Sequence, residues 1–121
     1  MTPMIEPIEI RVADVLGGSR AIDAADGAKV YEKILVALKL GRKVRLSFAG
    51  IRMVITAFLN ESVGKLYGSL PSQQVDELLE ISDLLPAFQT SVEKSIEWAK
   101  AYYADPGRME RALLESLDDA Q

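Results

Sequence analysis

The residues of this chain that could do chemistry lie at two places, around Thr56 and at Ser19-Arg20. Thr56 stands where an extended apolar segment ending at Ile55 gives way to apolar residues at helical spacing. A hydroxyl at the start of a helix can act as a nucleophile, accept a phosphate group, or cap the helix by accepting a backbone N–H bond. Each of these uses points to a different kind of protein.

The chain has no histidine and no cysteine among its 121 residues. This excludes Ser-His-Asp and Cys-His mechanisms, together with disulfides and thiolate metal sites. Carboxylate or lysine chemistry stays open, but the acidic residues have no spacing that singles out a catalytic pair. We therefore expect a protein that is not an enzyme and that needs no metal or cofactor.

The charge pattern argues against two classes of partner. Fourteen basic residues face eighteen acidic ones, for a net charge of -4, and the basic residues are scattered along the chain. Nucleic acid is bound through a basic surface, so we do not expect it as a partner. The N-terminus is acidic and interrupted by Pro, and no apolar run reaches about 18 residues. We expect a cytoplasmic protein without a membrane segment.

Two kinds of periodicity alternate along the chain. Alternation typical of half-buried strands occurs in residues 8–16 and again in residues 43–51. Helical spacing follows each of them, in residues 21–41 and 56–70. Asp23 or Asp26 is a suitable N-cap for the first of these helices, and Gly41 is a suitable stop. The segments predict an α/β arrangement.

The second half of the chain continues this order. Residues 75–84 suit a short strand centred on Leu79 and Ile81, although a helix is also compatible with them. Pro86 suits the first position of a third helix that ends before Asp105. We expect a domain over residues 5–104 and a C-terminal helix over residues 105–121 that packs on the domain or on a partner.

Aromatic residues gather near the end of the third predicted helix. Tyr103 shares an apolar stripe with Ala99, whereas Trp98 and Tyr102 lie four residues apart on the neighbouring face. Trp and Tyr are enriched at protein interfaces. This face therefore packs against the tail helix or forms a contact surface.

Three short motifs, taken in order, resemble the STAS-like family, small bacterial domains related to the anti-sigma factor antagonists. They are Ser19-Arg20, "LSFAGI" at 46–51 and "ITAFLNE" at 55–61, and the resemblance covers roughly residues 8–85. It implies a small mixed β-sheet with helices mainly on one face. It also implies a regulatory interaction module whose partner is a histidine-kinase-like ATPase or an anti-sigma-type kinase.

The resemblance also suggests where a switch would lie. In the antagonist relatives an Asp-Ser-Ser-Gly sequence begins the second helix, and a partner kinase phosphorylates one of its serines. Residues 55–58 occupy these positions, and Ala57 corresponds to the serine that is usually phosphorylated. Ser47 stands where relatives often carry an Asp. Thr56 is then the hydroxyl left at the junction, as a helix cap or as a phosphorylated switch.

The expected partner-binding residues are Ser19, Arg20, Asn60 and Glu61, with Thr56 as the candidate for phosphorylation. Two alternatives stay open. Ser19, Arg20 and Thr56 could serve a small nucleotide-binding or phosphotransfer protein. The tail helix could instead build a structural subunit or a homodimer.

Overall fold

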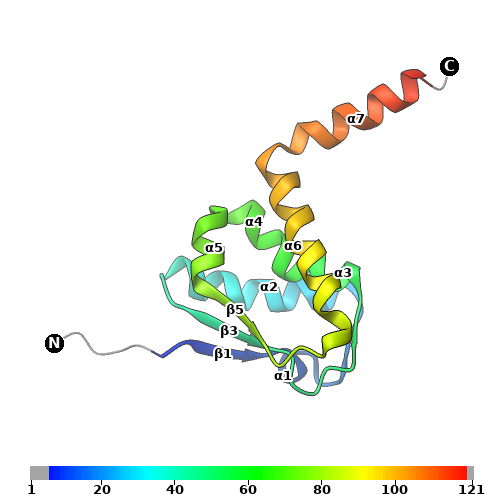
Figure 1. The fold of residues 1–121 in the computed structure, drawn as a ribbon. Helices are drawn as coiled ribbons and strands as arrows, with labels where there is room; N and C mark the ends of the chain where they lie inside the picture. The colour runs from blue at the N-terminus through cyan, green and yellow to red at the C-terminus, as the bar shows by residue number, and fades with distance from the viewer. Residues whose placement is uncertain (1–5, 120–121) are drawn as a thin grey trace.

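A parallel three-stranded sheet with the strand order β1-β3-β5 forms the centre of the fold (Figure 1). The computed structural model describes residues 6–119. The sheet consists of β1 (Ile8–Arg11), β3 (Val44–Ser47) and β5 (Leu79–Ser82). Two shorter strands, β2 (Arg20–Ala21) and β4 (Met53–Val54), pair in parallel with each other. The strand predicted around Leu79 and Ile81 is therefore confirmed.

The two faces of the sheet differ in polarity. The strand register aligns Ile8, Val44 and Leu79 in one row of the apolar face. One residue further on, Glu9, Arg45 and Glu80 form an exposed row on the opposite face. Arg45 Nε lies 3.3 Å from a carboxylate oxygen of Glu80. The prediction of a small sheet with helices mainly on one face is confirmed. The sheet is not mixed as expected, because helices connect its strands and all three run parallel.

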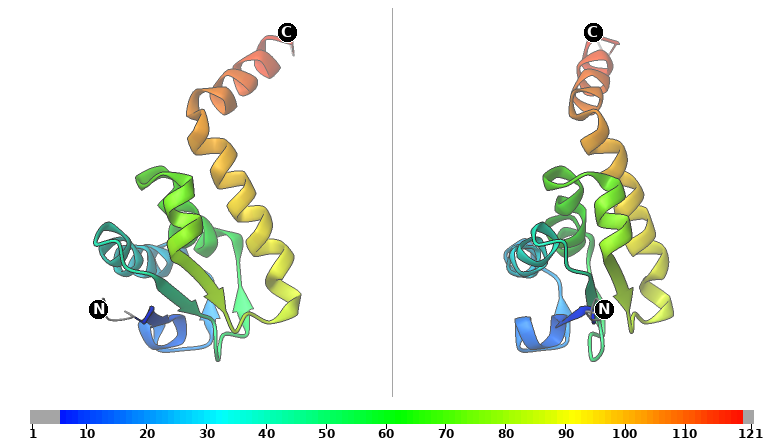
Figure 2. Two further views of the ribbon diagram at one scale, coloured as in Figure 1. Left: turned by 60° about the vertical axis from the view of Figure 1, so that its left-hand side comes forward. Right: turned by 90° about the vertical axis from the view of Figure 1, so that its left-hand side faces the viewer.

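Helices account for most of the remaining chain. In order they are α1 (Val12–Leu16), α2 (Ala24–Lys39), α3 (Thr56–Leu59), the π-helical segment η1 (Asn60–Gly64), α4 (Lys65–Ser69), α5 (Ser72–Leu78), the 3₁₀ turn η2 (Pro86–Phe88), α6 (Gln89–Ala104) and α7 (Pro106–Asp119). Helix α2 packs on β1 and β3 and against α3 and η1, and α6 packs against α3, η1 and α4. The segment from α3 to α4 thus lies between α2 and α6, as Figure 2 shows.

Helix α2 follows its sequence signals closely. The Asp23 carboxylate accepts a hydrogen bond from the Asp26 backbone N–H at 2.8 Å, so Asp23 is the N-cap. The helix ends just before Gly41, which has φ of 74°. Positive φ is a conformation that glycine adopts without strain. Both predicted boundaries of this helix are confirmed.

Both predicted strands in the first half of the chain are too long. The first one ends at Arg11, because the residues from Val12 to Leu16 coil into α1 with Val12 fully buried. The second one ends at Ser47, and the Ile51 N–H then donates to the Phe48 carbonyl in a tight turn. In both cases, apolar residues that continue the alternation are buried. They lie in a helix after the first strand and in a turn after the second, not in the strands themselves.

A polar cluster ties α4, α5 and α6 together. The Tyr67 hydroxyl and the Lys100 ammonium each donate to one oxygen of the Asp76 carboxylate, both at 2.8 Å. Burial and the Asp76 carboxylate raise the pKa of Tyr67. Desolvation acts to raise the pKa of Asp76, but the hydrogen bonds from Lys100 and Tyr67 outweigh it and lower that pKa below 3.8.

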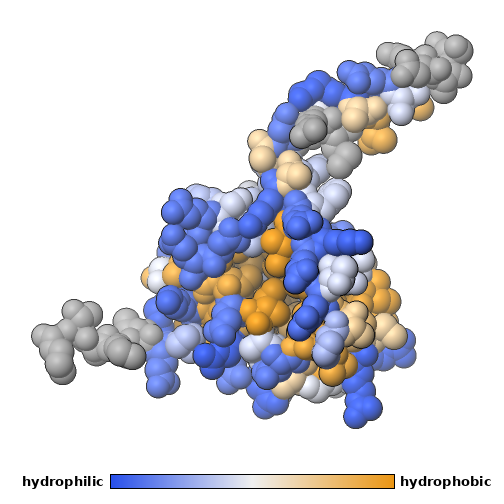
Figure 3. Space-filling model, viewed as in Figure 1, coloured by the Kyte–Doolittle hydropathy of each residue, from blue (hydrophilic) through white to orange (hydrophobic). Residues whose placement is uncertain are grey.

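The predicted C-terminal helix is present as α7, and residues 120–121 of its predicted range lie outside the described residues. It continues from the end of α6 and extends away from the rest of the domain (Figures 1 and 2). An ion pair of 2.9 Å between Asp105 and Arg111 spans the junction. Leu113, Leu114 and Leu117 are exposed, and Figure 3 shows apolar side chains along one side of this helix.

Candidate functional site

Thr56 is the first residue of α3, and the cap position belongs to Ile55, whose backbone is extended. Backbone N–H groups of Phe58 and Leu59 donate to the Ile55 carbonyl. The Thr56 side chain makes no capping hydrogen bond. The prediction that Thr56 caps this helix is therefore wrong by one position, and its exposed hydroxyl is not engaged by the helix that it starts.

Thr56 opens into a groove between the start of α3 and helix α6. This groove, here called the Thr56 groove, has a volume of about 340 Å³. It is lined by Thr56, Asn60, Ser91, Lys94, Ser95 and Trp98. Lys94 is the one ionisable residue among them. One concave surface thus carries three hydroxyl groups and an ammonium group. It lies at a helix N-terminus, where negative charge is stabilised.

A second hollow of about 260 Å³ adjoins the Thr56 groove and shares Asn60 and Trp98 with it. Glu61 lines this hollow, and one of its carboxylate oxygens lies 3.8 Å from Lys65 Nζ. Trp98 is 46% exposed and stacks on Tyr102, with ring centroids 5.0 Å apart. Desolvation raises the pKa of the neighbouring Tyr103. Three of the predicted site residues, Thr56, Asn60 and Glu61, therefore lie along one continuous surface.

The π-helical segment η1 shapes this surface. Buried Ser62 donates its hydroxyl to the Phe58 carbonyl at 2.8 Å, within the turn where the regular helical pattern widens. Gly64 lies close to α6, since a Cβ there would be in ordinary contact with the Ala99 Cβ at 3.5 Å. π-helical turns often occur at functional sites. Here the turn presents Asn60 and Glu61 toward α6.

Ser19 and Arg20 lie elsewhere. The Ser19 carbonyl accepts the Arg52 N–H at 2.8 Å, and Arg20 pairs with Met53 at the start of the β2-β4 ladder. Met53 precedes Thr56 by three residues, which is roughly 10 Å of extended chain. Neither Ser19 nor Arg20 lines the two hollows. The structure does not bring them to the Thr56 groove.

A family model described as "STAS-like domain of unknown function (DUF4325)" matches residues 26–87. The chain belongs to this family. The matched part of the STAS-like domain runs from the first turn of α2 through η2, so it includes Thr56, Asn60 and Glu61 but not Ser19-Arg20. No curated protein and no solved structure gives a significant match.

Half of the Thr56 groove was not anticipated from the sequence of this STAS-like domain. Ser91, Lys94 and Ser95 all come from α6, beyond the family match. With Trp98 they stand at i, i+3, i+4 and i+7 from Ser91, which places them along one helix face. That polar and aromatic face was detectable, but nothing in the sequence indicates that it packs beside Thr56.

A carboxylate also reaches Ser47 from an unpredicted source. The Ser47 hydroxyl donates to Asp83 at 2.7 Å, and the Ser82 hydroxyl donates to the same oxygen at 3.2 Å. Asp83 has φ of 58°, an uncommon conformation for a residue other than glycine. The loop after β5 thus supplies a carboxylate beside the position where STAS relatives often carry one on the strand itself.

Within residues 6–119, among the side chains that the structure describes, no group of three or more acidic residues is placed to hold a metal ion. No helix in the same range combines the length and the apolar composition needed to cross a bilayer.

Proposed function

We propose that this STAS-like domain is a non-enzymatic regulatory module that binds a partner protein through the Thr56 groove and the adjoining hollow. The observation that carries the proposal is the position of an exposed Thr56 hydroxyl in a groove that also contains Lys94 and the half-exposed Trp98. Membership of a STAS-like family supports a histidine-kinase-like ATPase, of the anti-sigma type, as the partner.

Phosphorylation of Thr56 is the proposed means of control. A phosphate adds a charge of about −1.5 to −2 and three strong acceptor oxygens. Because Thr56 starts α3, a phosphate on it would be stabilised by the free backbone N–H groups of that helix start. Lys94 lines the same groove and adds a positive charge. The modification would therefore convert a groove with the single positive charge of Lys94 into an anionic one, and a partner that fits the first form would be repelled by the second.

The test uses the purified full chain and the histidine-kinase-like ATPases of the same genome. We expect one of them to bind the domain in a pull-down assay and, with Mg-ATP, to phosphorylate Thr56, as located by mass spectrometry of the digested protein. Thr56→Glu should change the affinity at least tenfold, and Trp98→Ala should weaken it.

Thr90→Glu is the matched control, because Thr90 is an exposed threonine of α6 that does not line the groove. Equal binding by wild type, Thr56→Glu and Trp98→Ala would refute the groove as the contact surface. Calorimetry with millimolar ATP and GTP tests the alternative of a small nucleotide-binding or phosphotransfer protein. Nucleotide binding by the isolated domain would favour that alternative.

A further inference from the structure

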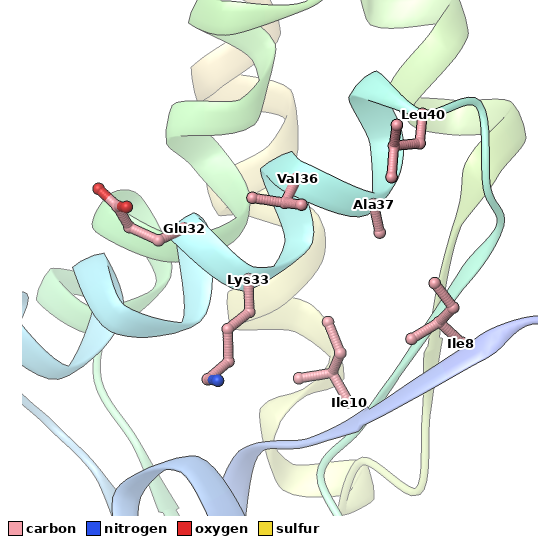
Figure 4. Close-up of a pocket in the computed structure, with 7 residues that line it drawn as sticks. All are labelled: Ile8, Ile10, Glu32, Lys33, Val36, Ala37 and Leu40. Atoms are coloured by element: carbon pink, nitrogen blue, oxygen red, sulfur yellow. The ribbon is translucent and has the colours of Figure 1, made fainter.

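A second groove, remote from Thr56, lies between the edge strand β1 and helix α2. Its volume is about 510 Å³, and it is lined by Ile8 and Ile10 of β1, by Val36 and Ala37 of α2, and by Leu40 just after α2. Figure 4 shows these side chains facing one another across the gap between strand and helix. We call this feature the β1-α2 groove.

Two of the apolar residues that line the β1-α2 groove are largely exposed. Val36 is 63% exposed and Leu40 is 74% exposed. They lie on the same side of α2, one turn apart, so they form a continuous apolar stripe. Large exposed apolar surfaces of this kind mark interaction sites.

Helix α7 carries the matching surface. Leu113 and Leu117 are 62% and 64% exposed, and Leu114 beside them is also exposed. These residues repeat at the spacing of one helix face, along a helix of 14 residues or about 21 Å. The molecule therefore has an apolar groove without a helix and an amphipathic helix without a groove.

The two surfaces also complement each other in charge. The last seven residues of α7 contain Glu115, Asp118 and Asp119 and no basic residue. On α2, both Lys33 and Glu32 line the groove beside its apolar residues, and Lys33 reaches toward β1 (Figure 4). Lys39 lies six residues further along α2. Among the side chains that the structure describes, neither Lys33 nor Lys39 has an ion-pair partner.

The two surfaces lie apart within one chain. Helix α7 begins directly after α6 and projects away from the domain, whereas β1 and α2 lie on the far side of the α3 to α4 segment from α6 (Figures 1 and 2). We propose that α7 of one copy docks in the β1-α2 groove of a second copy. If each copy docks its α7 in the groove of the other, a two-fold dimer forms in which the groove and α7 of both copies are covered.

The decisive experiment is sedimentation analysis of the full chain over a range of concentrations, with two complementary variants. The wild type should reach twice the mass of one chain. The helix variant, Leu113→Glu with Leu117→Glu, and the groove variant, Val36→Glu with Leu40→Glu, should each self-associate at least tenfold more weakly. All four residues are exposed, so circular dichroism should show unchanged folding.

Mixing the two variants distinguishes this dimer from other arrangements. The helix variant keeps an intact groove and the groove variant keeps an intact α7, so their mixture should form a heterodimer. Leu85→Glu, at an exposed apolar residue that does not line the groove, should dimerise like the wild type. Raising the ionic strength should weaken the wild-type dimer, because the acidic end of α7 faces lysines.

Several outcomes would overturn the proposal. A wild type that stays monomeric up to about 1 mM excludes useful self-association. A groove variant that still dimerises indicates pairing of α7 with α7, and a helix variant that still dimerises indicates pairing through β1. A mixture of the two variants that remains monomeric also rejects the exchange of α7. None of these results bears on binding at the Thr56 groove.

Discussion

Helix α2 and the helical segment from α3 to α4 pack against each other, yet they are built in different ways. Helix α2 is regular over 16 residues, has an Asp23 cap and stops before a glycine of positive φ. The segment over residues 56–69 starts without a side-chain cap and contains the π-helical turn η1. The regular helix supports the sheet, whereas the irregular one presents the candidate site. Local signals thus specify the support, and packing specifies the site.

The largest change in stability is expected at the contact between α2 and the segment from α3 to α4. A Cβ on Gly27 of α2 would lie 2.6 Å from the Phe58 backbone carbonyl oxygen. Gly27→Ala should therefore destabilise the fold by about 2 kcal/mol, although alanine ordinarily favours a helix by about 1 kcal/mol. Chemical denaturation measures the difference.

Gly64→Ala is the matched control on the irregular helix. There the nearest atoms to an added Cβ are at 3.4 and 3.5 Å, which is ordinary contact distance. The stability change should stay within about 0.5 kcal/mol. If both variants lost the same stability, the close approach of the helices at Gly27 would not be the cause.

The second prediction compares the two helix starts. Asp23→Ala removes a hydrogen bond to the first turn of α2 and should cost about 1 kcal/mol in the free energy of unfolding. Thr56→Ala removes no capping bond and should change it by less than about 0.5 kcal/mol. Thermal or urea unfolding of the two variants side by side gives the answer. A larger loss of stability for Thr56→Ala than for Asp23→Ala would indicate that the Thr56 side chain does cap its helix.

The smallest effect should appear in the pH dependence of the Tyr67-Asp76-Lys100 cluster, which joins the end of the irregular helix to α5 and α6. The Asp76 pKa is lowered in the folded state, so its contribution is fully present above pH 3.8 and is lost as the pH falls through the folded value. The pair with Lys100 is exposed, and its net contribution is below about 1 kcal/mol.

The measurement is urea unfolding between pH 2 and pH 6, with Asp76→Asn as the variant and Glu77→Gln as the control. The wild type should lose more stability than Asp76→Asn on acidification, whereas Glu77→Gln should follow the wild type. Parallel curves for all three would mean that Asp76 has the same pKa in the folded and unfolded states.

The sequence predicts the regular parts of this molecule well for a physical reason. The alternation of residues 8–11 and 44–47, the Asp23 cap and the glycine after α2 are all local properties of the chain. The π-helical turn is different, because the Ser62 hydroxyl bonds to a backbone carbonyl within a segment packed between two other helices. No local pattern distinguishes that turn from a regular one.

The candidate site follows the same division. Thr56, Asn60 and Glu61 were found because they start one helix, and their neighbours along the chain define their face. Lys94 and Asp83 were missed, because each comes from a distant segment that only the tertiary fold brings near. The family motifs grouped Ser19 and Arg20 with Thr56. The β2-β4 register places Arg20 beside Met53, at the end of the ladder that is farther from Thr56.

The row of Glu9, Arg45 and Glu80 has a consequence for aggregation. The sheet is open, and β1 and β5 are its two edges, where a foreign strand could add. Each edge carries a glutamate, while the arginine lies on the central strand between them. Stacking β1 of one molecule beside β5 of another would bring Glu9 against Glu80, and like charges on adjacent strands are destabilising. The same row that makes one face of the sheet polar therefore discourages its growth into continuous fibrils.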